Sequence, residues 1–173
     1  MFLKCFGAVA LVTLGLAGVA GGASAESHKI TMVRIQQSVE IAAAPAAVWT
    51  HLTTGKNLAT WCPQWKGVSN AKVNLTRVGD VLDFTDAYGN GGRSVVTYLD
   101  KGKELRVTHE PDNGSYMCQA RVTVAPSGKG ARVQLSDSYT DESKPADMEA
   151  TRKKSEADMA AELAALKKEI EGK

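Results

Sequence analysis

The feature that most constrains the fold is a series of short alternating segments, separated by turn residues, that fills the middle of the chain. Glycine, asparagine, aspartate and proline cluster between the segments, as in Gly89-Asn90-Gly91-Gly92 and Pro111-Asp112-Asn113-Gly114. Regularly spaced short strands with such turns are typical of an antiparallel meander. The segments predicted as strands are 68–75, 81–86, 93–99, 105–109, 116–124 and 132–139.

The segments on either side complete an α+β pattern. Residues 32–41 alternate apolar and polar side chains, which predicts one further, half-buried strand. Pro45 suits the first position of a short helix that Gly55 ends, and a second helical turn covers 57–61. The order is therefore one strand, two short helices, six strands and a long closing helix. A seven-stranded antiparallel sheet must cover its inner face, so we expect it to curl around that helix.

The closing helix is amphipathic over about seven turns. Its predicted inner stripe recurs at steps of three and four residues and comprises Met148, Thr151, Ser155, Met159, Leu163, Leu166 and Ile170. Glu162 and Lys167 are predicted to lie off that stripe. The small side chains of Thr151 and Ser155 favour a cavity beneath the helix over tight packing against the sheet.

The N-terminal segment has the pattern of a secretion signal. Lys4 precedes an uncharged run of alanine, valine, leucine and glycine, and Ala23-Ser24-Ala25 provides small residues where a signal peptidase cleaves. We therefore predict a signal peptide over 1–25, cleavage after Ala25, and a single domain over 26–173 that is periplasmic or secreted. The apolar run is too short and too rich in glycine for a retained membrane anchor, and no second long apolar run follows, so no integral membrane span is expected.

Composition excludes several classes of function. The formal net charge is +2, or +1 once Lys4 is removed, and basic and acidic residues are interleaved, which argues against nucleic acid as a partner. The three histidines are scattered and no Cys-x-x-Cys occurs, so neither a metal site nor a cofactor is expected. Cys62 and Cys118 could pair in an oxidising compartment. The predicted strand order separates them along the sheet, and we expect both thiols to stay free.

Three local patterns resemble the START-like (SRPBCC) superfamily, in particular its polyketide cyclase/dehydratase and lipid-transport branch. They are SVEIAAAPAAVWTHLT from Ser38, NLATWCPQWKGV from Asn57 and VGDVLDF from Val78. The resemblance covers 33–171 in element order. It implies a helix-grip fold, in which the curved sheet wraps the terminal helix and leaves a cavity between them. It also assigns Trp49 and Trp61 to packing of the small helices.

Strand alternation selects the side chains that would line this cavity. If the faces that carry Val96, Leu105, Val122 and Leu135 look inward, a few polar tips enter an apolar chamber, as in many small-molecule sites. The predicted ligand-binding residues are Phe84, Tyr98, His109, Tyr116, Cys118, Asp137, Tyr139, Ser155 and Met159. His109 and Asp137 are weak candidates for a catalytic base and the group that orients it.

The expected function is binding or carriage of a small hydrophobic or amphipathic molecule, such as a lipid, an aromatic or a polyketide-like compound. One alternative is a cyclase/dehydratase-type enzyme that uses the same cavity. Another is a protein-binding module related to chaperone activators, against which the signal peptide argues. The expected oligomeric state is a monomer or a weak dimer.

Overall fold

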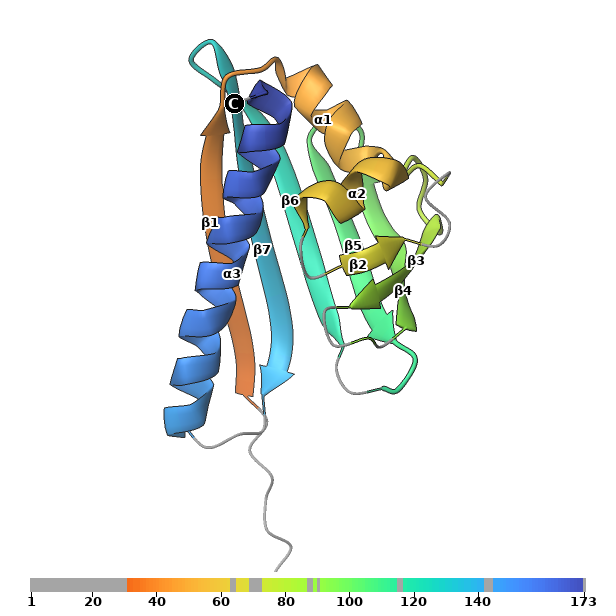
Figure 1. The fold of residues 1–173 in the computed structure, drawn as a ribbon, viewed down its shortest axis with the longest axis vertical. Helices are drawn as coiled ribbons and strands as arrows, with labels where there is room; N and C mark the ends of the chain where they lie inside the picture. The colour runs from red at the N-terminus through yellow and green to blue at the C-terminus, as the bar shows by residue number, and fades with distance from the viewer. Residues whose placement is uncertain are drawn as a thin grey trace, which may run out of the picture.

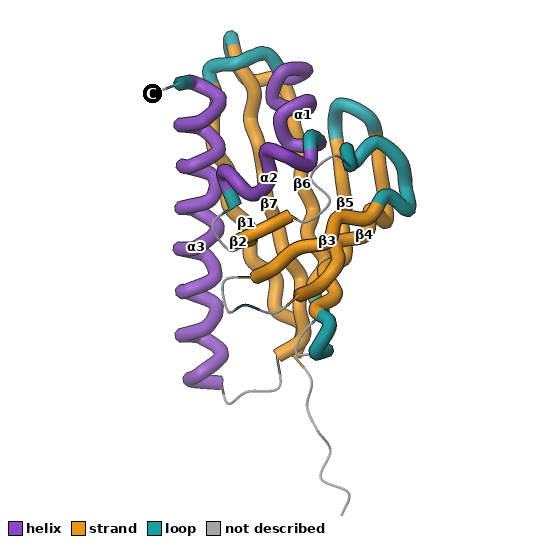
Figure 2. The backbone as a smooth tube through the Cα atoms, turned by 45° about the vertical axis from the view of Figure 1, so that its right-hand side comes forward, coloured by secondary structure: helices purple, strands orange, loops and turns teal. Residues whose placement is uncertain are grey.

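The structure is a computed structural model that describes residues 31–62, 65–68, 73–86, 89, 91–114, 117–141 and 145–172. Seven strands form one antiparallel sheet, and three helices lie on the same face of it (Figures 1 and 2). In chain order the elements are β1 (Thr31–Ile41), α1 (Pro45–Thr53), α2 (Gly55–Trp61), β2 (Trp65–Val68), β3 (Val81–Asp86), β4 (Gly91–Asp100), β5 (Glu104–Pro111), β6 (Cys118–Ser127), β7 (Gly130–Asp141) and α3 (Pro145–Glu171). The predicted α+β class and helix-grip arrangement are confirmed.

The sheet order is β1-β7-β6-β5-β4-β3-β2, so that the first strand lies at one edge beside the last. β1 and β7 pair without interruption from Thr31 opposite Asp141 to Ile41 opposite Ala131. β2 to β7 follow one another as a meander, as the turn-separated segments predicted.

Helix α3 runs along β1 and β7, while α1 and α2 lie over the neighbouring part of the sheet (Figure 1). The core fills the space between these helices and the inner sheet face. From α3 it takes Met159, Leu163 and Leu166, none more than 3% exposed. Leu52 and Trp61 contribute from the small helices. The helix ends at Gly172, whose φ of 67° is a conformation that glycine adopts without strain.

Two predicted boundaries are wrong for local reasons. Gly55 begins α2 instead of ending α1, because Thr54 adopts an extended conformation (φ −90°, ψ 113°) and separates the two helices. The strand predicted over 68–75 is displaced, since β2 covers Trp65–Val68. The Leu75 backbone N–H instead donates to the Thr53 carbonyl at 2.8 Å, which attaches this segment to the end of α1. Residues 69–72 lie outside the described residues.

The predicted inner stripe of α3 is correct except at Thr151. Met159, Leu163 and Leu166 are buried, and Met148 and Ile170 are half-buried against the core. Thr151 is exposed and Ser155 is half-buried.

Candidate functional site

A cavity of about 170 Å³ lies between the helices and the inner face of the sheet. Its walls come from α1, α2, α3 and the central strands β5, β6 and β7, together with Leu75. Most of the lining is apolar. The lining residues are Leu52, Leu58, Trp61, Cys62, Leu75, Leu105, Val107, His109, Cys118, Ala120, Val122, Leu135, Asp137, Met159 and Glu162.

Strand alternation determines which side chains of the sheet line the cavity. Leu105, Val107 and His109 project from one face of β5, because successive side chains of a strand point to opposite faces. The register then aligns the polar groups: His109 pairs with Cys118 on β6, and Ala120 pairs with Asp137 on β7. The predicted inward faces of β5, β6 and β7 are therefore the faces that line the cavity.

His109 is held in place by two neighbours. Its ring Nδ1 lies 2.7 Å from Oγ of Ser94, a fully buried residue on β4. The ring edge of Phe84 packs against it, with 6.1 Å between the centroids and an interplanar angle of 85°. Burial lowers the pKa of His109 to about 4, so the imidazole is neutral near pH 7.

Two carboxyl groups enter the cavity from opposite walls, Asp137 from β7 and Glu162 from α3. Burial raises the pKa of Asp137 to about 6. Burial, and then the negative charge of Asp137, raise the pKa of Glu162 to about 7. The Cys62 thiol donates to Glu162 Oε1 at 3.6 Å and opposes this shift slightly. Each carboxyl can therefore be protonated or ionised close to neutral pH.

The two cysteines line the same cavity, and they do not form a disulfide. This agrees with the prediction that they stay unpaired, although they do not lie at separate ends of the sheet as expected. Burial and the nearby charges of Asp137 and Glu162 raise the pKa of Cys118 to about 12. At neutral pH this thiol is therefore protonated and a poor nucleophile.

Four of the predicted ligand-binding residues line the cavity: His109, Cys118, Asp137 and Met159. Phe84 is buried behind the wall, where it contacts the His109 ring. Tyr139 is half-buried against the core and Ser155 is half-buried on α3, and neither lines the cavity. Tyr116 lies outside the described residues.

The prediction that Tyr98 faces the interior is wrong. Its side chain is 42% exposed, and the Arg106 guanidinium stacks over its ring at 4.8 Å. The cause is an irregularity in β4: Val96 pairs with Val107 but Tyr98 pairs with Arg106, so that Thr97 is an extra residue in the ladder. Such a bulge reverses the alternation beyond it and rotates Tyr98 to the outer face.

On the helical side of the cavity, sequence reasoning identified only Met159. Glu162, predicted to lie off the inner stripe, forms part of the wall, as do Cys62 and Trp61. The available signal was the spacing of Met159 and Glu162, which places both on one side of the helix. This strip of α3 faces the cavity, while Leu163 faces β1.

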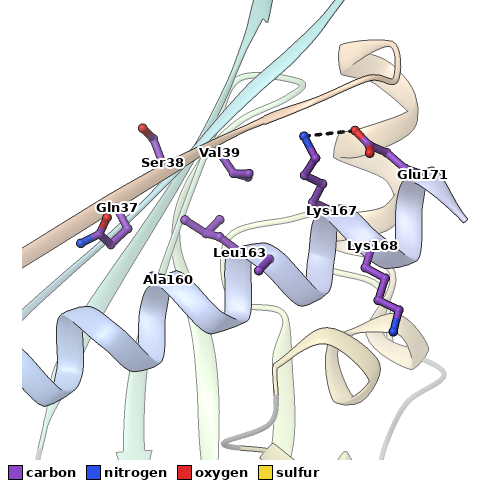
Figure 3. Close-up of a pocket in the computed structure, with 9 residues that line it drawn as sticks. Gln37, Ser38, Val39, Ala160, Leu163, Lys167, Lys168 and Glu171 are labelled. Atoms are coloured by element: carbon purple, nitrogen blue, oxygen red, sulfur yellow. Dashed lines mark ion pairs between the residues drawn. The ribbon is translucent and has the colours of Figure 1, made fainter. Parts of the chain in front are cut away.

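A second hollow of about 370 Å³ lies on the outside, between β1 and α3 (Figure 3). Two of its charged residues, Lys167 and Glu171, are paired within the protein. Lys167 Nζ donates to the Glu40 carbonyl at 2.7 Å and lies 3.5 Å from Glu171 Oε1. Glu171 Oε1 also accepts the Ala42 backbone N–H at 2.7 Å. The carboxyls of the internal cavity have no lysine or arginine beside them among the described lining residues, and this cavity is therefore the candidate site.

A curved antiparallel sheet closed by a long C-terminal helix, with a cavity between them, defines the helix-grip class of ligand-binding proteins. The chain belongs to the polyketide cyclase/dehydrase and lipid transport family, whose model matches residues 32–171. No curated protein sequence matches it significantly.

Solved structures agree with this fold at low sequence identity. Truncated norcoclaurine synthase from Thalictrum flavum is 18% identical, with a TM-score of 0.60 over 82% of this chain and 94% of that one. The Aha1 dimer from Colwellia psychrerythraea is 20% identical, with a TM-score of 0.58 over 80% and 96%. DynU16, from the dynemicin biosynthetic locus, is 15% identical with a TM-score of 0.61 over 80% of this chain, which spans only 47% of that protein.

The part of the chain that the structure describes contains neither a membrane-spanning helix nor a cluster of metal ligands. None of its helices has the length and apolar character needed to cross a membrane. Its histidine, cysteine, aspartate and glutamate side chains nowhere gather in a group of three or more that could hold a metal ion.

Proposed function

We propose that this protein binds a small, mainly apolar molecule with a polar end in the internal cavity, and that it does so outside the cytoplasm. The observation that carries the proposal is the composition of the wall. Apolar side chains dominate it, and Asp137 and Glu162 enter it as polar groups from opposite sides. Binding sites for small molecules typically combine a greasy lining with a few polar groups that orient the ligand.

The volume of the cavity limits the size of the ligand that it can hold. A dry apolar cavity of about 150 Å³ accepts a benzene molecule in a well-studied engineered case. A volume of about 170 Å³ therefore fits a compound of about one ring with a short substituent. A long-chain lipid would require the helices to move away from the sheet.

The location outside the cytoplasm rests on the Ala23-Ser24-Ala25 cleavage pattern. Mass analysis of the exported protein should give a chain that begins at Glu26. A chain that keeps Met1 in a membrane fraction would contradict both the processing and the location.

The binding test is native mass spectrometry of the purified protein, which should reveal a co-purified small molecule. Ala120→Leu adds bulk to the cavity wall and should abolish this adduct, whereas Ala160→Leu, on the exposed surface of α3, should keep it. Circular dichroism verifies that both variants are folded. An equal amount of adduct in both variants would place the ligand elsewhere.

A proton-transfer enzyme of the cyclase/dehydratase type is the second candidate, and one specific observation favours it. Asp137 and Glu162 titrate at about 6 and about 7, near the pH at which an acid–base catalyst works best. Asp137→Asn would then abolish turnover of a bound substrate while its affinity persists. A simple carrier has no turnover to lose.

A further inference from the structure

The charges in the cavity are of one sign. Two carboxyl groups line it, and none of the described lining residues is a lysine or an arginine. His109 is the one basic side chain among them, and burial keeps its ring neutral near pH 7. The described residues therefore supply no positive charge at this wall to balance Asp137 or Glu162.

Three polar groups of the wall, those of Asp137, Glu162 and Trp61, have few or no partners among the described residues. Asp137 makes no hydrogen bond or ion pair with any residue that the structure describes. For Glu162, the one partner in that part of the chain is the weakly donating Cys62 thiol at 3.6 Å. On the adjacent wall, Trp61 is only 5% exposed and its indole Nε1–H has no acceptor among the described residues. Asp137 and Glu162 are half-buried and Trp61 is buried. Polar groups that are largely removed from water are normally paired in native proteins, so these groups require another explanation.

Leaving an ionised carboxylate unpaired in an apolar site is costly, and a second carboxylate nearby increases the cost. One bound positive charge would relieve both effects, because the attraction between opposite charges is strong where water is excluded. A neutral ligand would relieve neither. An anionic ligand would add a third negative charge.

We propose that the cavity selects a small organic cation, a protonated amine on an apolar frame of about one ring, with Asp137 and Glu162 as its counter-ions. This inference rests on the proposed function and specifies the ligand class for the same site. The apolar frame contacts the aliphatic side chains of β5 and β6. The Trp61 N–H is available to an oxygen acceptor carried by the ligand.

The affinity for such a cation depends on pH in a defined direction. A bound cation favours the ionised carboxylates, so affinity increases as pH rises through about 6 to 7 and then levels off while the amine stays protonated. The titratable groups that face this pair are Cys62 after α2, His109 on β5, Cys118 on β6 and Asp158 on α3. Burial holds the pKa of His109 at about 4 and raises that of Cys118 to about 12, so neither of these two groups changes its charge over this range.

The test compares three probes of nearly equal size and different charge: benzylamine, benzyl alcohol and benzoate. Binding to the mature protein is measured at about pH 7.5 by calorimetry and by the fluorescence of Trp61 in the cavity wall. Benzylamine should bind at least about tenfold more tightly than benzyl alcohol, and benzoate should bind most weakly. Lowering the pH to about 5 should remove most of this preference.

Variants locate the effect. Asp137→Asn combined with Glu162→Gln should abolish the preference for benzylamine over benzyl alcohol. Glu40→Gln removes the same charge at an exposed position of β1 and should keep the preference. Benzyl alcohol binding as tightly as benzylamine to the wild-type protein would overturn this inference alone. If no probe bound and no molecule co-purified, the proposed function would fail as well. The comparison of the three probes on the wild-type protein tests this inference even if the double variant does not fold.

Discussion

Glu104 and Glu162 are the same side chain in two opposite environments. Glu104, on β5, accepts hydrogen bonds from Arg121 Nη2 at 2.7 Å and from Arg106 Nε at 2.7 Å. These bonds, led by that of Arg121, hold its pKa at about 2. Glu162 enters the cavity without an arginine or lysine beside it in the described residues, and burial raises its pKa to about 7.

Glu104 shows that this fold can place arginines beside a carboxylate and so stabilise its negative charge. Glu104 is paired with Arg106 on the same strand and with Arg121 on the neighbouring strand β6, which is a stabilising arrangement. In the cavity no equivalent cation approaches Asp137 or Glu162 from the described residues. Unpaired acids that destabilise the folded state are characteristic of sites kept for a ligand or for catalysis.

The largest expected effect tests the position next to Glu162 on α3. Leu163 is 2% exposed and packs in the core, so Leu163→Ala should lower the free energy of unfolding by about 2–5 kcal/mol. Because no charge is involved, the loss should be similar at about pH 5 and about pH 8. Chemical denaturation at both pH values measures it. A loss below about 1 kcal/mol would mean that α3 is rotated from the position described.

Glu162→Gln should raise the free energy of unfolding near pH 8, the opposite of the effect expected for Leu163→Ala. The pKa of Glu162 is raised in the folded state, so its stabilising contribution is present below the unfolded pKa of 4.5 and is lost as pH rises through about 7. Relative to wild type, the variant should gain about 2 kcal/mol between about pH 5 and about pH 8. Urea unfolding across this range measures the gain, with Glu40→Gln as a control that should show none. A stability difference independent of pH would contradict the unpaired state of Glu162.

Glu104→Gln provides the counterpart on the paired acid. The pKa of Glu104 is lowered, so its stabilising contribution is present above 4.5 and is lost as pH falls through about 2. The expected destabilisation near pH 7 is at most about 1 kcal/mol, because Arg106 is 40% exposed at its side chain and water screens the pair. Thermal unfolding from neutral to acid pH would show the two curves converge as the pH falls from about 4.5 to about 2. If Glu104→Gln instead stabilised the protein near pH 7, the two glutamates would not differ in their effect on stability.

The smallest expected effect is on the reactivity of Cys118. Burial and the neighbouring carboxylates raise its pKa to about 12, so it should react slowly with iodoacetamide in the folded protein near pH 8. Glu162→Gln removes one of those charges and should speed labelling by up to about tenfold for each pKa unit recovered. Peptide mass spectrometry follows the rate, with the denatured protein as the fully reactive reference. An unchanged labelling rate in the variant would mean that the charge of Glu162 does not raise the pKa of Cys118.

Much of the sheet side of the site could be predicted from the sequence. Alternation is a property of the backbone itself, so His109 on β5 and Asp137 on β7 could be assigned to the inner face before the sheet was known. The same rule failed at Tyr98, where one extra residue at Thr97 reversed the alternation. A bulge depends on how two strands align, and neither strand alone contains that information.

The helical side of the site could be predicted much less well. A helix shows its apolar stripe in the sequence, but the stripe does not say which neighbouring strip faces a cavity and which faces a strand. The rotation of α3 over β1 and β7 places Leu163 in the core and Glu162 in the cavity wall. Cys62 and Trp61 enter the same wall because α2 packs against α3, an encounter between segments about a hundred residues apart in the chain.

The sequence by itself determined which segments become strands and helices, because periods of two and of 3.6 residues, turn glycines and Pro45 act through local geometry. It also determined the family, since the order of these elements is a property of the chain. Only the tertiary structure decided that Asp137 and Glu162 share one cavity without a cation beside them. That decision depends on long-range packing and on desolvation, and both arise only when distant segments exclude water together.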